Sequence, residues 1–95
     1  MFAQFNFGDP QSEIRDAIGD HLEAALAPFV GISIVGRLAG WGSWADEATG
    51  ERYHEQSGSV QFLMPDSDKM RDVVEAIASE AAAKFEQDAV AVLFG

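Results

Sequence analysis

The sequence contains no cysteine among its 95 residues. The absence of thiols excludes disulfides, thiolate zinc sites and cysteine nucleophiles. There is also no uninterrupted apolar run near the roughly 18 residues of a transmembrane helix. Residues 1–5 carry no basic region of the kind that opens a signal peptide. We therefore expect a soluble, cytoplasmic protein.

Basic residues are scarce. Six Lys and Arg stand against sixteen Asp and Glu, which gives a formal net charge of −10. Such a surface repels phosphate backbones and anionic lipids, so direct binding of nucleic acid or of a membrane is disfavoured. A basic protein partner is favoured instead, because the long-range field would steer its capture. The other interpretation is that the acidity serves only solubility.

The first half of the sequence predicts a strand, a helix and a second strand. Residues 2–7 alternate apolar and polar side chains, as in a half-buried strand. A helix is expected over residues 10–27, because Asp9 is a preferred N-cap residue and apolar side chains then recur at helical spacing. Residues 29–39 predict the second strand. Its two sides would carry Val30, Ile32, Ile34, Gly36 and Leu38 on one, and Ser33, Val35 and Arg37 on the other.

The second half predicts a loop, a strand, a helix and a last strand. Residues 40–50 hold three glycines and a turn-forming sequence, which favours a loop. Residues 53–64 predict a strand with a bulge or bend at 57–59. Cap residues and first-turn acids then indicate a helix over residues 65–87. Residues 88–94 predict the closing strand.

The order of these elements is typical of two split β-α-β units. Such units fold as a four-stranded antiparallel sheet with both helices on one face, the ferredoxin-like α+β fold, here as one domain over residues 1–95. The open face of the sheet would mix polar and apolar groups, and domains of this fold often use that face to dimerise or to bind ligands. By alternation, the open face would show Gln4, Asn6, Ser33, Val35, Arg37, Gln61 and Leu63.

Motifs that carry catalysis are lacking. The two histidines, His21 and His54, have no spacing typical of a zinc site. No serine lies in a Gly-x-Ser-x-Gly sequence, and the glycines form no phosphate-binding loop. We therefore expect no catalytic residue, no metal site and no cofactor.

Four carboxylates share one face of the first predicted helix. This acidic row would lie nearly opposite the apolar stripe and could imitate the charge of a nucleic-acid backbone toward a basic partner. The alternative is the ordinary solvated face of an amphipathic helix. The acidic row consists of Glu13, Asp16, Asp20 and Glu23.

Two tryptophans stand three residues apart among glycines. Tryptophan is enriched at binding hot spots, so at least one of them is a candidate partner contact. The alternative is that Trp41 covers the open end of the core and Trp44 lies flat on the sheet. Nearby acidic residues again suit a basic target. The resulting tryptophan segment comprises Trp41, Trp44, Asp46, Glu47 and Glu51.

Two resemblances accompany these patterns. Gly40 and Trp41, then Glu55, Ser57 and Val60, then residues 85–90 resemble a small bacterial domain family with no assigned function, which implies a fold and no activity. Separately, the short length, acidity, absence of cysteine and lack of catalytic motifs are similar in kind to phage-encoded inhibitors such as anti-CRISPR proteins.

The leading hypothesis is a non-enzymatic acidic protein that inhibits a basic, nucleic-acid-handling partner by mimicry of nucleic acid or by steric block. The acidic row and the tryptophan segment would make the contact, in a monomer or a homodimer. The alternative hypothesis is a small dimeric enzyme or ligand-binding domain that uses the open sheet face and His54.

Overall fold

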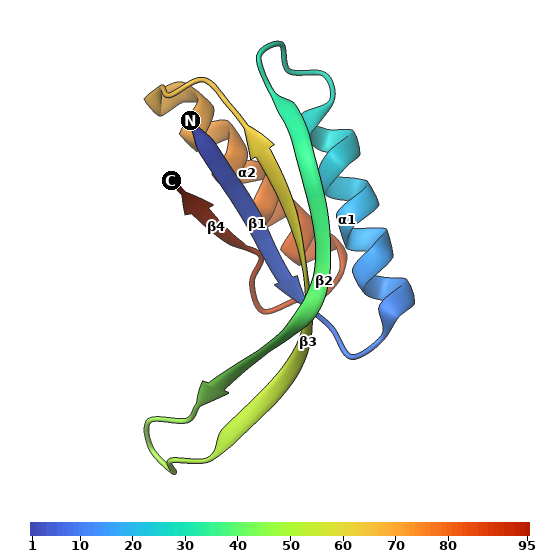
Figure 1. Cartoon of the computed structure of the whole chain (residues 1–95), viewed down its shortest axis with the longest axis vertical. Helices are drawn as coiled ribbons and strands as arrows, with labels where there is room; N and C mark the ends of the chain where they lie inside the picture. Colours follow the sequence, from blue (N-terminus) through green and yellow to red (C-terminus); the bar gives the residue numbers. More distant parts are fainter.

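Six elements follow one another in a computed structural model of the chain (Figure 1). The structure describes the backbone of residues 1–95 and the side chains of residues 1–40, 45–52 and 56–95. The elements are β1 (Phe2–Gly8), α1 (Ser12–Leu26), β2 (Ser33–Ala45), β3 (Arg52–Leu63), α2 (Asp68–Lys84) and β4 (Ala91–Phe94).

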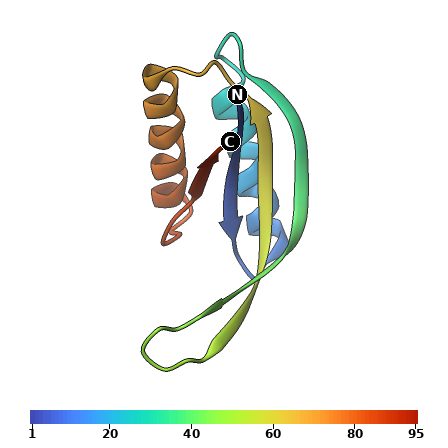
Figure 2. The same cartoon turned by 60° about the vertical axis from the view of Figure 1, so that its left-hand side comes forward.

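The four strands form one antiparallel sheet in the order β2-β3-β1-β4. Both helices cover the same face, and the other face is open (Figures 1 and 2). This arrangement confirms the predicted ferredoxin-like α+β fold.

The core lies between the sheet and the two helices. Phe5 and Phe62, on neighbouring strands, are fully buried, and their ring centroids lie 5.1 Å apart. The alternation predicted for β1 is confirmed, since Ala3, Phe5 and Phe7 are buried on the side of the helices. The buried apolar residues are Ala3, Phe5, Phe7, Ile18, Leu22, Leu26, Val60, Phe62, Met64, Val74, Ala78, Ala81 and Val90.

Strands β2 and β3 extend well past the rest of the sheet as a two-stranded arm (Figure 1). Their pairing continues to Ala45 opposite Arg52, and the molecule reaches 44 Å in its longest dimension. The predicted loop over residues 40–50 is therefore wrong for residues 40–45. Backbone pairing requires no particular side chain, so a glycine-rich segment forms a strand when a partner strand lies beside it.

The second strand begins later than predicted. Residues 29–32 form a turn in which Gly31 has a φ of +90°, and Val30 is 96% exposed. A left-handed residue at this position suits glycine and interrupts an extended chain. The strand begins at Ser33, so the earlier start that the apolar residues Val30 and Ile32 predicted is wrong.

Strand β2 contains a bulge near its start. Ile34 lies opposite Phe62, but the next pair is Gly36 with Gln61, so Val35 is an extra residue. Side chains alternate along a strand, so one extra residue moves all later side chains to the opposite face. Side chains at even-numbered positions of β2 therefore face one side of the sheet before the bulge and the other side after it.

The bulge turns Arg37 toward the helices. Arg37 lies opposite Val60, which is fully buried in the core. Leu38 faces the open side and is 61% exposed. The predicted sides of the strand are thus wrong from Gly36 onward, because strict alternation assumes a strand without a bulge. At residues 57–59, where a bulge or bend was predicted, the register is continuous.

The helix ends differ from prediction by a few residues. Gln11 is the N-cap of α1 without a side-chain cap bond, and Asp9 Oδ1 instead accepts a hydrogen bond from the Gln11 amide at 2.8 Å. Ser67 caps α2 by accepting from the Met70 amide at 3.2 Å. Glu86 has a φ of +53°, which ends helical geometry before residue 87. The last strand accordingly starts at residue 91 and not at 88.

Neither α1 nor α2, whose side chains are all described, is long and apolar enough to cross a membrane. The cytoplasmic location goes further than this finding and stays a prediction. The basic protein partner and the choice between monomer and homodimer also stay predictions.

Candidate functional site

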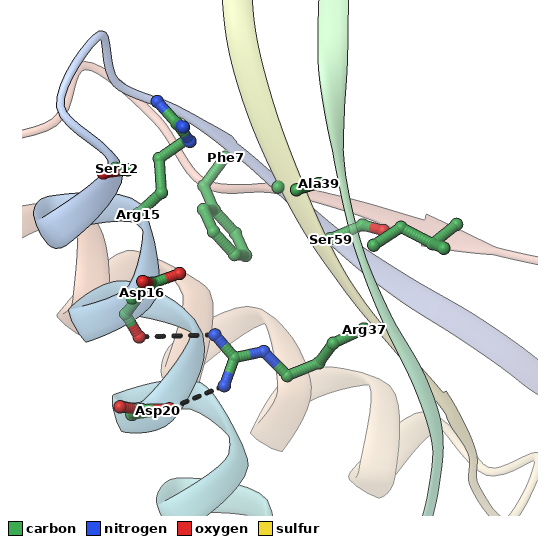
Figure 3. A pocket seen from close by; sticks show the side chains of 10 residues that line it. Phe7, Ser12, Arg15, Asp16, Asp20, Arg37, Ala39 and Ser59 are labelled. Carbon is green, nitrogen blue, oxygen red and sulfur yellow. Dashed lines mark hydrogen bonds and ion pairs between the residues drawn. The ribbon is translucent and has the colours of Figure 1, made fainter.

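A cavity of about 550 Å³ lies between α1 and the β2–β3 pair and is open to solvent. Its volume falls within the range of about 300–1,000 Å³ that is usual for small-molecule sites. Helix α1 forms one wall and the two strands form the other (Figure 3). The lining residues are Phe7, Ser12, Arg15, Asp16, Asp20, Arg37, Leu38, Ala39, Gly58 and Ser59.

Small residues on the strands leave room for this cavity. Ala39 on β2 lies opposite Gly58 on β3, which in turn lies opposite Phe7 on β1. A Cβ atom at Gly58 would lie 2.6 Å from the Phe7 ring, so the ring packs against bare backbone. Phe7 is 5% exposed and lines the cavity with an apolar surface.

Arg37 joins β2 to α1 across the cavity (Figure 3). Its Nη1 donates to Asp20 Oδ1 at 2.6 Å and to Glu23 Oε2 at 3.0 Å, and its Nη2 donates to the Asp16 carbonyl oxygen at 3.3 Å. The hydrogen bond to Asp20 is the largest cause of a raised pKa for Arg37, although burial opposes it. Arg37 thus stays charged and compensates two carboxylates of the acidic row.

Gly19 provides the surface on which the Arg37 guanidinium lies. A Cβ atom at Gly19 would come within 2.6 Å of Arg37 Cζ. A larger residue at this point of α1 would push the guanidinium away from Asp20 and Glu23. Gly19 therefore supports the ion pairs at a cost in helix propensity.

Replacing Gly19 with alanine tests this arrangement. Alanine in a helix interior is about 1 kcal/mol more favourable than glycine. We expect the full gain in an Arg37→Ala background and a smaller gain in the wild type, where the new methyl group displaces the guanidinium. Urea denaturation of the four proteins of this cycle measures the difference. Equal gains in both backgrounds would show that Gly19 does not support Arg37.

The structure separates the predicted site residues into two regions. Of the acidic row, Asp16 and Asp20 line the cavity, and Glu23 pairs with Arg37. Glu13 is exposed on α1 and is not part of the cavity lining. Two of the four carboxylates, Asp20 and Glu23, are thus paired within the chain itself.

The acidic residues of the tryptophan segment lie at the end of the arm, away from the cavity lining. Asp46 Oδ1 accepts from the amides of Ala48 at 2.8 Å and Thr49 at 3.1 Å, which closes the turn. Glu51 follows that turn, and its carbonyl oxygen accepts from the Asp46 amide at 2.8 Å. Glu47 is exposed within the turn. The side chains of Trp41, Trp44 and His54 lie outside the described residues.

The open face of the sheet carries a second, smaller hollow of about 250 Å³. It lies on the face that the alternative hypothesis assigned to ligand binding. Arg37 is absent from it because the bulge turns that side chain to the helices. The residues around this hollow are Gln4, Asn6, Leu38, Ala39, Gly40, Ser57, Gly58 and Ser59.

His21 belongs to the contact between the helices. Its Nε2 lies 2.7 Å from Glu80 Oε2, and its ring meets the edge of Phe85 at a centroid distance of 5.6 Å. Among the residues with described side chains, no three of His, Asp or Glu converge as a metal site would require.

Several cavity residues were not predicted. Arg15 was not singled out, Arg37 was assigned to the open face of the sheet, and Ala39 and Gly58 carry no functional signal of their own. An arginine within an otherwise apolar strand was the one available sign that Arg37 has a specific partner. Strict alternation placed it on the wrong face, so that sign was missed.

Two solved structures of a phage SAM lyase resemble this chain over nearly its whole length. The lyase in complex with S-methyl-5'-thioadenosine has a TM-score of 0.67 and 20% sequence identity, and the match covers 96% of this chain and 76% of the lyase chain. The lyase in its apo state has a TM-score of 0.65 and 20% identity, with coverage of 96% and 75%. No family model matches the sequence, and no curated protein matches it.

These neighbours contradict the prediction of a non-enzymatic, anti-CRISPR-like inhibitor, because both of these solved structures are of an enzyme. The prediction relied on acidity and on the lack of catalytic motifs. A motif reports residues that are close in sequence, whereas this cavity is lined by residues from four elements. The alternative hypothesis of a small enzyme or ligand-binding domain agrees better with the fold that this chain shares with phage SAM lyase.

Proposed function

We propose that this chain is a small enzyme that binds S-adenosylmethionine and cleaves it as a lyase, releasing S-methyl-5'-thioadenosine. The observation that carries the proposal is the cavity of about 550 Å³ lined by both cationic and anionic side chains. The likeness in fold to phage SAM lyase supplies the class of substrate.

The charge of the chain suits this substrate. S-adenosylmethionine carries a positive sulfonium, a positive ammonium and a negative carboxylate, so it is a net cation at neutral pH. The chain has a formal net charge of −10, and its field attracts small cations toward the surface. The thioadenosine product lacks all three charges and gains nothing from that field. The acidity therefore favours capture of the substrate over retention of the product.

The reaction requires no co-reactant. The bond between the sulfonium sulfur and the four-carbon amino-acid chain breaks, and its electron pair moves to sulfur, which becomes a neutral thioether. The carbon left behind gains a bond in one of two ways. Its own carboxylate oxygen closes a lactone, or a neighbouring C–H bond supplies the electrons of a double bond and its proton passes to solvent.

A neutral leaving group reduces what the protein must contribute. The thioether departs without being protonated, so the site does not need a general acid for the leaving group. The protein contributes by holding the substrate in a reactive conformation. This chemistry is compatible with a chain that shows no catalytic motif in its sequence.

The direct test is to incubate the purified protein with S-adenosylmethionine and to quantify S-methyl-5'-thioadenosine by chromatography and mass spectrometry. S-adenosylmethionine also decomposes without an enzyme, so a protein-free reaction is the necessary control. We expect release well above that background, and NMR would distinguish a lactone product from an alkene. Release equal to the background would reject the proposed activity.

Salt dependence provides a second prediction. Raising the ionic strength shortens the Debye length from about 10 Å at 0.1 M to about 3 Å at 1 M and screens the field of the chain. We expect kcat/KM for S-adenosylmethionine to fall several-fold across this range. Inhibition by the uncharged S-methyl-5'-thioadenosine should change little. Parallel changes in both quantities would show that the acidity has no part in substrate capture.

A further inference from the structure

The open face of the sheet carries no charged side chain among its described residues. Charged residues make up 23% of the whole chain. Residues 2–8, 33–40, 56–63 and 91–94 nevertheless contain a single one, Arg37, which the bulge turns toward α1. The open face, away from both helices (Figure 2), is formed by Phe2, Gln4, Asn6, Ser33, Leu38, Ser57, Ser59, Gln61, Leu63, Ala91 and Leu93.

Exposed apolar side chains gather on this uncharged face. Phe2 lies opposite Leu63 on the neighbouring strand β3, and Leu93 on β4 lies opposite Gln4. Leu63 is 46% exposed and Leu93 is 55% exposed. Single exposed apolar residues are ordinary on a protein surface, but several on one face mark an interaction surface. We refer to Phe2, Leu63 and Leu93 as the open-face patch.

The polar side chains beside the open-face patch are neutral amides that bind one another. Gln4 Nε2 donates to Asn6 Oδ1 at 2.7 Å, and Gln61 Nε2 lies 3.5 Å from Gln4 Oε1 as a long hydrogen bond. Covering a polar group that already has a partner costs much less free energy than covering a charge or an unpaired group. The amides therefore allow this face to lose its water.

The carboxylates of the helices lie on the other side of the sheet. Two copies that met through their open faces would keep both pairs of helices on the outside. Packed sheets lie about 10 Å apart and the helices form further layers beyond them, so these carboxylates would be roughly 20 Å or more apart. This separation exceeds the Debye length of about 8 Å at physiological ionic strength. The carboxylates concerned are Glu13, Asp16, Asp20, Glu23, Asp68, Asp72, Glu75 and Glu80.

We propose that the open face of the sheet binds a second copy of this chain, with the open-face patch at the centre of the contact. The chain has a net charge of −10, so copies that met through their helices would repel each other. The uncharged face is where two such copies meet without that repulsion. A basic protein would instead be attracted to the acidic helices, since a face without charge offers it no electrostatic gain. The inference does not depend on the proposed lyase activity.

Sedimentation equilibrium of the full chain, from micromolar to millimolar protein, tests the proposal. We expect the wild type to reach a mass above the 10.2 kDa of the monomer. Leu63→Asp and Leu93→Asp should each weaken association about 30-fold or more, the size of a hot-spot effect. Leu93→Lys should also weaken it, although it lowers the net charge, because the contact buries a charge of either sign.

Val30→Asp is the matched control. It adds the same charge at a residue that is 96% exposed in the turn before β2 and outside the sheet. Association of this variant should change less than about threefold. Thermal denaturation at the lowest protein concentration, where the monomer dominates, checks the fold of each variant apart from assembly. Raising the salt concentration from 0.1 M to 1 M should strengthen wild-type association, because the repulsion between like charges is screened.

Three results would overturn the proposal. A wild type that sediments at 10.2 kDa at every concentration would leave the open face to a ligand or to a different protein. Assembly that tolerates both aspartate variants would place the contact elsewhere on the chain. Weakening by Leu93→Asp together with strengthening by Leu93→Lys would show that only the overall charge matters. Weakening by all three substitutions, with the Val30 variant unaffected, supports the open face as the contact.

Discussion

Replacing Ala39 with tryptophan is expected to reduce kcat/KM for S-adenosylmethionine by roughly 100-fold or more, since even small misplacements of a substrate have effects of that size. Ala39 lines the cavity and lies opposite Gly58, which has no side chain. An indole at this position would occupy the volume that the substrate requires. Ala39 is exposed, so the larger side chain does not enter the core. Steady-state release of S-methyl-5'-thioadenosine measures the loss.

Ser33→Trp is the matched control for this prediction. Ser33 is an exposed residue of the same strand and lines neither hollow. Both variants should melt within a few degrees of the wild type, and the Ser33 variant should keep its activity. Full activity in a folded Ala39→Trp protein would show that the cavity is not where the substrate binds.

Replacing Phe5 with alanine should cause the largest loss of stability. Phe5 is fully buried and packs against Phe62 at a centroid distance of 5.1 Å. Removing a buried phenylalanine side chain costs about 3–5 kcal/mol, including the cavity that remains. Small domains are stable by about 5–15 kcal/mol in total, so the variant would be close to unfolding. Urea denaturation monitored by circular dichroism gives the free energy of unfolding.

Phe2→Ala on the same strand provides the comparison. Phe2 belongs to the open face of the sheet and is 42% exposed. Its loss should therefore lower the free energy of unfolding by about 1 kcal/mol or less. Similar losses for Phe2 and Phe5 would be incompatible with a core confined to the helix side of the sheet.

The acidic composition led to the wrong functional prediction, that of a non-enzymatic inhibitor. The net charge does predict attraction to something positive. A small cation responds to that field as a basic protein does, so charge alone does not indicate the size of the partner. Under the proposed function, the positive species is a small cation and not a basic protein.

The sequence by itself determined the order of the elements and the faces that form the core. Apolar side chains recur every second residue in β1 and every three to four residues in α1 and α2, and each pattern is a property of one segment. The fold class follows, because those faces must be buried against one another. The acidic row could also be predicted from the sequence, because its spacing depends on α1 alone.

Only the tertiary structure decided which residues meet in the cavity. The bulge at Val35 depends on how β2 pairs with β3, and it brings Arg37 to α1. The space opposite α1 exists because Ala39 and Gly58 fall at the same level of the sheet. A single segment contains no information on the register of its neighbour, so these features become visible only once the strands are paired.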